Sequence, residues 1–232
     1  MSRWNPETIA FILLAILTLS LLVTTGGSML EALGFKHLDW SEVARQKMQS
    51  EDPTVRLQGV RLLANLRDGS LITLHRKLLE DPNQAVRRAA IEGLRSRNEA
   101  AFLDLHFKAL SDPSTSLRQR AVETLQDSGA DPWVGEALLK ALSDYQPRVQ
   151  SLALETLVRH YLPASHDKRF SEPLQFLATD PRPSFRLLAV KGLSILKESK
   201  AQPILKRLAE SDPQPEIRDL AARTLPQLTT VR

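Results

Sequence analysis

The chain has 232 residues, of which 42% are hydrophobic and 25% are charged, a balance typical of a folded protein. It contains no cysteine, which excludes disulfides, thiolate metal sites and a cysteine nucleophile. The 31 basic and 27 acidic residues give a net charge of +4, and no dense Lys/Arg run with interleaved aromatics predicts nucleic-acid binding. Aromatic residues make up only 5%, while Leu and Ala are abundant, so the composition favours an all-α protein.

An uncharged segment near the N-terminus predicts one transmembrane helix. Ile9–Val23 contains no charged residue, and residues 8–25 would form about 27 Å of helix. This length is close to the roughly 30 Å of a bilayer's hydrocarbon core. The segment is apolar on all sides, unlike the single apolar stripe of a soluble helix. A cleaved signal peptide is the alternative, although Thr24-Thr25-Gly26 is a poor cleavage site.

The charges beside this segment orient it only weakly. The close flanks favour an N-terminus inside the cell, whereas wider flanks that include Arg45 and Lys47 favour the opposite. We expect a single-pass protein of the bacterial cytoplasmic membrane, with its soluble part slightly favoured outside the cytoplasm. The expected division is a tail and anchor over 1–25, a juxtamembrane linker or short helix over 26–37, and a repeat domain over 38–232.

Six copies of one motif follow the anchor, at spacings of 29, 31, 32, 36 and 32 residues. Each copy begins at an aspartate, usually followed by proline: Asp52, Asp81, Asp112, Asp144, Asp180 and Asp212. A hydrophobic residue comes next: Val55, Val86, Leu117, Val149, Phe185 and Ile217. Four residues on is a small one: Gly59, Ala90, Ala121, Ala153, Ala189 and Ala221. Leucine follows after four more: Leu63, Leu94, Leu125, Leu157, Leu193 and Leu225. Steps of four put these columns on one helix face, with Asp as the expected N-cap and Pro in the first turn.

Each motif is preceded by a segment with apolar residues at helical spacing. These segments begin near Trp40, Leu71, Phe102, Val134, Phe170 and Ile204. Every unit is therefore predicted to be a helical hairpin. No hairpin can bury its apolar stripe alone, so successive hairpins stack. The predicted fold is an all-α solenoid of about six hairpins, preceded by one transmembrane helix.

The motif of Asp-Pro, a hydrophobic residue and Arg, then Ala and Leu, resembles the HEAT repeat. The resemblance is especially to the short bacterial variety named after phycobilisome lyases, and it covers about residues 38–228. The resemblance implies a ladder of Asp and Arg side chains between successive turns. The residues concerned are Asp81 with Arg87, Asp112 with Arg118, Asp180 with Arg186, and Asp212 with Arg218. The first unit departs because Asp52 and Arg56 are only four residues apart, and Gln150 replaces Arg in the fourth, where a weak rung is expected.

The second helices carry the candidate partner site, since they line the inner face of solenoids in that family. One exposed column is acidic in the middle and basic at both ends: Arg61, Glu92, Glu123, Glu155, Lys191 and Arg223. A neighbouring column becomes apolar in the last three units: Leu152, Leu188 and Leu220. These leucines either complete the core or form an apolar groove with basic neighbours. The candidate partner-binding residues are Leu152, Glu155, Leu188, Lys191, Leu220 and Arg223.

Two further features bear on function. The segment Tyr161–Lys168 lengthens one unit and is predicted to be either a partner-binding loop or a tolerated surface insertion. The five histidines match no metal-site spacing, and phosphate-binding loops and nucleophile elbows are missing from the sequence. We therefore expect no catalytic residue, no metal and no cofactor.

Together these features predict a membrane-tethered, non-catalytic scaffold or an accessory subunit of a membrane complex. Its partners would be membrane-associated proteins, residues 8–25 would contact lipid, and nucleic acid is not expected. One alternative is a peripheral module that binds anionic lipid through the basic excess. The other is a lyase-like enzyme of the HEAT-repeat type.

Overall fold

A computed structural model describes residues 40–65, 72–95 and 102–228. The chain divides into two compact units, Met1–Val43 and Ala44–Arg232. Only Trp40–Val43 of the first unit is described, so the architecture below is that of the second unit. The predicted anchor at residues 8–25 and the linker at 26–37 lie outside the described residues. Within the described ranges, no helix has both the length and the apolar character needed to cross a bilayer.

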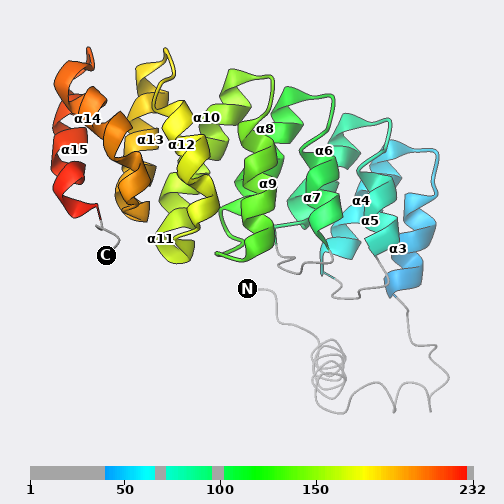
Figure 1. Ribbon diagram of the computed structural model, residues 1–232. Helices are drawn as coiled ribbons and strands as arrows, with labels where there is room; N and C mark the ends of the chain where they lie inside the picture. The colour runs from blue at the N-terminus through cyan, green and yellow to red at the C-terminus, as the bar shows by residue number, and fades with distance from the viewer. Residues whose placement is uncertain (1–39, 66–71, 96–101, 229–232) are drawn as a thin grey trace, which may run out of the picture. The chain divides into compact units, whose positions relative to one another are not determined.

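The described residues form six pairs of helices, which confirms the predicted all-α repeat architecture (Figure 1). The first helices of the pairs are α3 (Trp40–Met48), α5 (Ile72–Leu78), α7 (Leu103–Ala109), α9 (Pro132–Leu142), α12 (Ser171–Leu177) and α14 (Gln202–Ser211). The second helices are α4 (Pro53–Asn65), α6 (Gln84–Gly93), α8 (Thr115–Leu125), α10 (Pro147–Thr156), α13 (Pro183–Leu196) and α15 (Pro215–Thr224).

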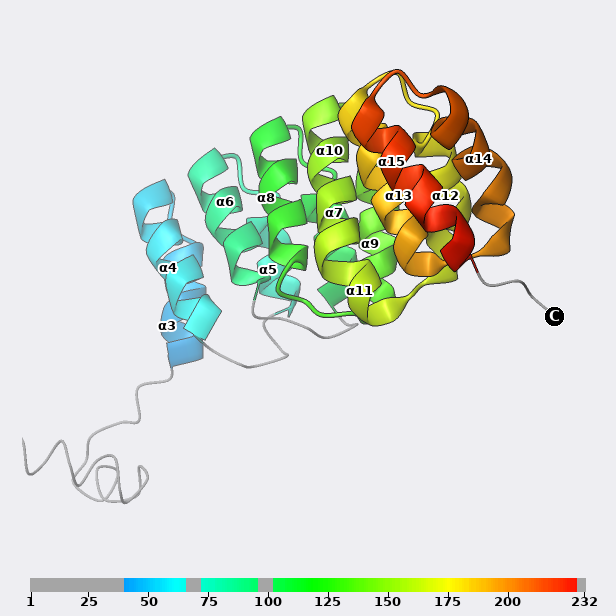
Figure 2. The same cartoon turned by 90° about the vertical axis from the view of Figure 1, so that its left-hand side faces the viewer.

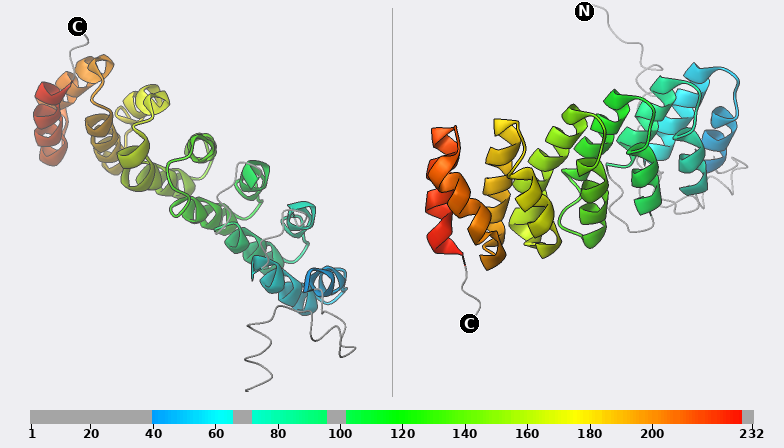
Figure 3. Two further views of the ribbon diagram at one scale, coloured as in Figure 1. Left: turned by 90° about the horizontal axis from the view of Figure 1, so that it is seen from below. Right: turned by 45° about the horizontal axis from the view of Figure 1, so that its top comes forward.

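The second helices pack on one another in chain order, from α4 to α15. Figure 2 shows α4, α6, α8 and α10 side by side, and Figure 3 shows the two rows of helices from other directions. The predicted small residues are buried in this packing: Gly59, Ala90, Ala121, Ala153, Ala189 and Ala221. A Cβ on Gly59 would lie 3.0 Å from the carbonyl oxygen of Ala44 in α3. The small column therefore sets how closely helices approach within and between hairpins.

The hydrophobic column forms the core between the two rows. From the second hairpin onward it is at most 3% exposed: Val86, Leu117, Val149, Phe185 and Ile217. Burial of each such side chain contributes about 1.5–3 kcal/mol relative to exposure. Each side chain comes from a different hairpin, so the core is continuous along the stack.

The second helices start later than the Asp-Pro motif predicts in every hairpin except the first. α4 begins at Pro53, directly after Asp52, but α6 begins at Gln84 with Asn83 as its N-cap. The reason is that the aspartate makes an Asx turn instead of a helix cap. Asp81 Oδ1 accepts a 2.8 Å hydrogen bond from the backbone N–H of Asn83, and the later motif aspartates do the same two residues on. The N-cap interpretation was therefore wrong for five of the six copies.

Among the described residues, a ladder of ion pairs joins neighbouring hairpins at four of the five steps. In four rungs an arginine Nε lies 2.6–2.7 Å from an aspartate oxygen: Arg56–Asp81, Arg87–Asp112, Arg118–Asp144 and Arg186–Asp212. Arg87, Arg118 and Arg186 also donate, through Nη1, to the backbone carbonyl oxygen of the aspartate in their own hairpin. Nη1 of Arg118, for example, donates to the carbonyl oxygen of Asp112 at 2.8 Å. Each guanidinium thus fixes its own turn and the neighbouring one.

The ladder departs from the sequence expectation at the first and fourth hairpins. Arg56 pairs with Asp81 although it lies only four residues after Asp52. Its Nη1 donates to the carbonyl oxygens of Ser50 and Glu51, which replace the aspartate carbonyl used in the other hairpins. In the fourth hairpin Gln150 still donates to the carbonyl oxygen of Asp144 at 2.7 Å. A neutral amide cannot form an ion pair with Asp180, and Gln150 Oε1 instead accepts a hydrogen bond from Arg182 Nη2 at 3.3 Å.

Two aspartate–arginine positions near the C-terminus lack the expected partner. The Asp180 carboxylate is held by Arg182, two residues further along its own turn, with Nη2 at 2.6 Å. Arg218 in α15 donates to the carbonyl oxygens of Asp212 and Pro213. No ion pair of Arg218 occurs among the described residues. The last arginine of the ladder therefore keeps the hydrogen bonds to backbone carbonyls in its own turn but makes no ion pair with a following aspartate in the described part of the chain.

Acid should weaken the ladder. Burial alone would raise the pKa of the Asp81 and Asp212 carboxyls, but hydrogen bonds and charges from Arg56 and Arg186 outweigh it, so each pKa lies below its ordinary value. A carboxyl with a lowered folded-state pKa stabilises the fold fully above its unfolded pKa of about 4, and this contribution is lost as the pH falls through the folded-state pKa. We expect the urea midpoint, followed by circular dichroism, to fall steadily below about pH 4.

Asp81→Asn should make that decline shallower, because the asparagine keeps the Asx turn but has no carboxyl to protonate. The exposed Asp104 provides the matched control, since its side chain is 72% exposed. Asp104→Asn should leave the pH profile unchanged. A profile that Asp81→Asn and Asp104→Asn alter equally would contradict the role given to the ladder.

The inserted segment is folded rather than an open polar loop. Leu157–Tyr161 forms a π-helical turn, and α11 (Leu162–Ser165) follows it, with Tyr161 and Leu162 fully or almost fully buried. The Tyr161 hydroxyl donates to Asp167 at 2.9 Å. Arg169 binds the same carboxylate at 2.7 Å and lowers the pKa of Asp167. Arg169 Nη2 also donates to the carbonyl oxygen of Pro132 in α9 at 3.2 Å, which joins the insertion to the stack.

Candidate partner-binding face

The exposed side of the second helices, which we call the B face, carries all six predicted partner residues. Leu152 and Glu155 lie on α10, Leu188 and Lys191 on α13, and Leu220 and Arg223 on α15. These helices are successive neighbours in the row. The structure therefore brings the predicted residues onto one face.

The three leucines of this set are half-buried and pack against the hydrophobic core. They fit the interpretation as core residues, and they still leave part of each side chain on the B face. Lys191 and Arg223 are exposed beside them. Nε of Arg223 donates to the carbonyl oxygen of Asp219 at 3.2 Å, which occupies a donor without neutralising its charge.

The acidic residues in the middle of the B face are neutralised by nearby arginines. Arg120 lies between Glu92 and Glu123, at 3.4 Å and 2.6 Å from their carboxylates. Glu155 pairs with Arg159, one turn further along, at 3.1 Å. The sequence column suggested an acidic centre, but these pairs cancel most of its charge. Among the described residues, the cations of this face that no carboxylate neutralises are Arg88 toward one end and Lys191 and Arg223 toward the other.

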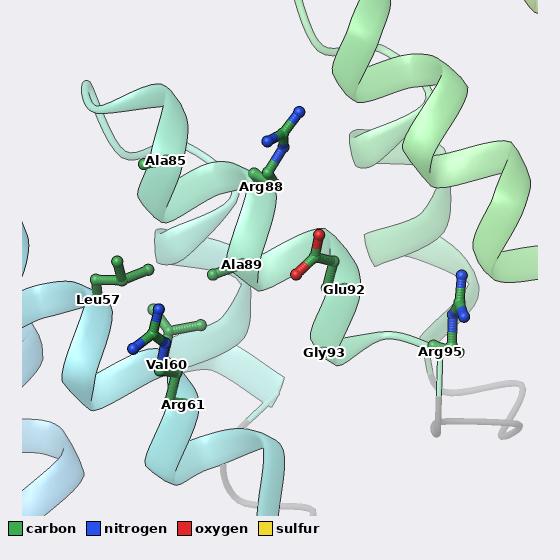
Figure 4. Close-up of a pocket in the computed structure, with 9 residues that line it drawn as sticks. All are labelled: Leu57, Val60, Arg61, Ala85, Arg88, Ala89, Glu92, Gly93 and Arg95. Atoms are coloured by element: carbon green, nitrogen blue, oxygen red, sulfur yellow. The ribbon is translucent and has the colours of Figure 1, made fainter.

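A groove of about 490 Å³ lies on the B face between α4 and α6 (Figure 4). Its volume is in the range of small-ligand and side-chain pockets. The residues that line it are Leu57, Val60, Arg61, Ala85, Arg88, Ala89, Glu92, Gly93 and Arg95. Figure 4 shows Leu57 and Val60 of α4 facing Ala89 of α6, so the floor is apolar.

The rim of this groove carries more positive than negative charge. Arg61, Arg88 and Arg95 are exposed on it, against one carboxylate, Glu92. Glu92 is already paired with Arg120 outside the groove, and Arg95 lies 3.4 Å from Asp127. Arg88 extends away from α6 in Figure 4, and no acidic partner for it lies among the described residues.

This groove was not predicted from the sequence, although one signal for it was present. Where the later hairpins have Leu152, Leu188 and Leu220, the second has Ala89, with Ala85 one turn before it. Small residues one turn apart leave a hollow on a helix face. The neighbouring Leu57 and Arg88 gain importance only when α4 and α6 are seen side by side.

The histidines form no second candidate site. His75 is buried, with Nε2 2.6 Å from the carbonyl oxygen of Ala90, and His106 is buried against the ring of Trp133. Both are therefore part of the packing. Within the part of the chain that the structure describes, no three His, Asp or Glu side chains converge as metal ligands would.

Sequence comparison gives one family match. A family model described as HEAT repeats matches residues 41–105 and 135–226, together more than half of the chain. No curated protein matches the chain significantly.

Several solved structures share the fold. A designed armadillo repeat protein in complex with the peptide (KR)4 has a TM-score of 0.56 and 18% identity, over 82% of this chain and 100% of that one. A HEAT-like repeats protein from the archaeon Thermococcus onnurineus NA1 has a TM-score of 0.51 and 15% identity, over 85% of this chain and 90% of that one. An engineered protein has a TM-score of 0.52 and 18% identity, over 83% and 97%. At such identities the similarity concerns the fold alone.

Proposed function

Because this chain belongs to the HEAT repeat family, we propose that it is a non-catalytic scaffold that binds a protein partner on its B face and is tethered to a membrane by residues 8–25. The observation that carries the proposal is the groove between α4 and α6, whose apolar floor is bordered by charged side chains. Apolar hollows with charged rims are typical of protein interaction sites. A stack of this kind is a protein-interaction fold, and the designed armadillo relative with its bound peptide supports that use.

The last three hairpins would provide a second contact region on the same face. Leu188 and Leu220 offer half-buried apolar surface, and Lys191 and Arg223 add charge that is not neutralised by a carboxylate among the described residues. A partner that spans the B face would therefore meet cations at both ends. The apolar segment 8–25 supports the tether, because it is long enough to cross most of a bilayer.

The partner contact is tested by isolating the full-length protein in mild detergent and identifying what co-purifies. Leu188→Asp with Lys191→Glu should remove the partner or lower its recovery about tenfold or more, since it places an acidic charge in an apolar contact. Lys191→Glu alone, on an exposed residue, should weaken recovery without affecting folding. Lys206→Glu, on an exposed lysine of α14, is the matched control and should change nothing.

The proposal fails if the protein is always recovered alone, or if the paired variant retains its partner as well as the control does. The tether is tested separately by extracting membranes with alkaline carbonate. An anchored protein stays in the membrane pellet under this treatment, whereas a peripheral module that binds lipid through charge is released into the supernatant.

A further inference from the structure

We propose that the groove between α4 and α6 takes an acidic segment of the partner, with carboxylates held by Arg88 and its neighbours and an apolar side chain seated on the groove floor. This inference rests on the proposed function and specifies the chemistry of the partner. The charges left on the B face, once its ion pairs are formed, decide which kind of segment fits.

The carboxylates of the B face do not favour a basic partner. Glu92, Glu123 and Glu155 would attract one if their charges were free. All three are paired, through Arg120 and Arg159. A basic segment would therefore have to displace an arginine from its partner before it could bind.

Two cations at the groove, Arg88 and Arg95, are accessible to an incoming anion. Arg88 has no carboxylate partner in the described residues, and it lies directly on the groove rim. Arg61 and Arg95 lie on the same rim. Arg95 meets Asp127 only at 3.4 Å, with both side chains at least half exposed, a pair that contributes little and can be exchanged. A bidentate contact between arginine and an incoming carboxylate is stronger than such a pair.

The groove floor adds an apolar requirement. Leu57 and Ala89 are half-buried and offer apolar surface that a purely ionic ligand would leave uncovered. An acidic segment with an aliphatic side chain between its carboxylates satisfies the rim and the floor together. Charge complementarity and shape thus select an acidic, leucine-containing segment rather than a uniformly charged one.

The test uses the full-length protein in mild detergent and fluorescence anisotropy of labelled, end-capped octapeptides. The acidic probe alternates Asp with Leu, and three comparison peptides alternate Lys with Leu, Asp with Ser, and Ser with Leu. We expect the Asp-Leu peptide to bind most tightly and to lose affinity as salt is added. Arg88→Glu should weaken it about tenfold or more, because a like charge then faces each carboxylate.

Leu57→Ser should also weaken the Asp-Leu peptide, while leaving the Asp-Ser peptide nearly unchanged. Lys206→Glu makes the same charge change on the other row of helices and should leave every affinity unchanged. Circular dichroism of Arg88→Glu should match the parent protein, since Arg88 is exposed. Equal binding of the Lys-Leu peptide, or an Arg88→Glu variant with undiminished affinity, would overturn the proposal.

A lipid headgroup is the competing source of anionic charge. Dihexanoyl-phosphatidylserine, a soluble lipid, is therefore added to the bound Asp-Leu peptide, with dihexanoyl-phosphatidylcholine as control. Selective displacement by the serine lipid would assign the groove to lipid and overturn the peptide proposal. If no acidic peptide binds but a partner still co-purifies, this inference fails while the proposed scaffold function stands.

Discussion

Replacing Arg118 by alanine is expected to lower the free energy of unfolding by about 3–5 kcal/mol, the largest loss among the ladder arginines. The side chains of Arg118 and Asp144 are only 3% and 6% exposed, and two hydrogen bonds join them at 2.6 and 3.1 Å. Removing the guanidinium leaves the Asp144 carboxylate buried without a counter-ion, which is far more harmful than losing an exposed pair. Urea denaturation of the full-length protein at neutral pH measures the change.

Arg218 is the natural control for that experiment. It occupies the same position in the last hairpin but holds only backbone carbonyls, so Arg218→Ala should lower stability by about 1 kcal/mol. Adding Asp144→Asn to Arg118→Ala should recover part of the loss, because it removes the unpaired charge and keeps the Asx turn. Equal losses for Arg118→Ala and Arg218→Ala would refute the inter-hairpin rung as the source of the stability.

Replacing Phe170 by alanine is expected to lower the free energy of unfolding by about 3–5 kcal/mol. Phe170 is fully buried, and its ring meets that of Tyr161 edge-on with centroids 5.7 Å apart. The substitution would open a cavity beneath the inserted segment and remove the contact that seats Tyr161. The same urea titration measures this loss.

The matched control is six residues further along the chain. Phe176 on α12 is 76% exposed. Phe176→Ala therefore truncates a phenylalanine that is already in water, and it should change the free energy of unfolding by no more than about 0.5 kcal/mol. If both variants lose the same stability, the insertion is not anchored by Phe170. If neither variant loses stability, Phe170 is not buried as described here.

The repeat architecture could be predicted because its information is periodic. Columns such as Val86, Ala90 and Leu94 recur at steps of four in every hairpin, and helix periodicity turns that spacing into one buried face. The proline at Pro147 likewise marks a helix start, since its missing N–H loses nothing in a first turn.

The details that depend on contacts between hairpins were not predictable in the same way. The Asp81 carboxylate accepts from Asn83 in its own turn and, through both oxygens, from Arg56 in the preceding hairpin. The sequence alone offers helix capping as an equally good use of this side chain. The replacement of the fourth rung by Arg182 depends on a side chain two residues after its partner, outside the repeated columns. The spacing of residues within one repeat does not show which side chain will pair with an aspartate of another turn.

The candidate site, too, was predictable where it depends on helix periodicity and not where it depends on contacts between helices. The sequence placed Leu152, Leu188 and Lys191 on one face, as their helix positions require. It did not single out the groove, because a hollow arises from what two helices leave unfilled. Ala89 on α6 and Leu57 on α4 are ordinary residues in sequence, and only their proximity makes a floor.

The break in the ladder has a consequence for how the stack comes apart. Between the fourth and fifth hairpins no arginine among the described residues crosses to the next aspartate, and the inserted segment with buried Tyr161 and Phe170 lies at that step. Apolar packing of α10 against α13 and a neutral hydrogen bond acceptor, Gln150 Oε1 with Arg182 Nη2 at 3.3 Å, join the hairpins there, whereas the steps of the ladder have an ion pair between arginine and aspartate. The Asp167 and Asp180 carboxyls at this step also have lowered pKa values, but each pairs with an arginine of its own segment, so protonating them breaks no ion pair of the ladder. Protonation in acid therefore loosens the ladder steps first, and the region around α10 and α13 becomes the most persistent cooperative block.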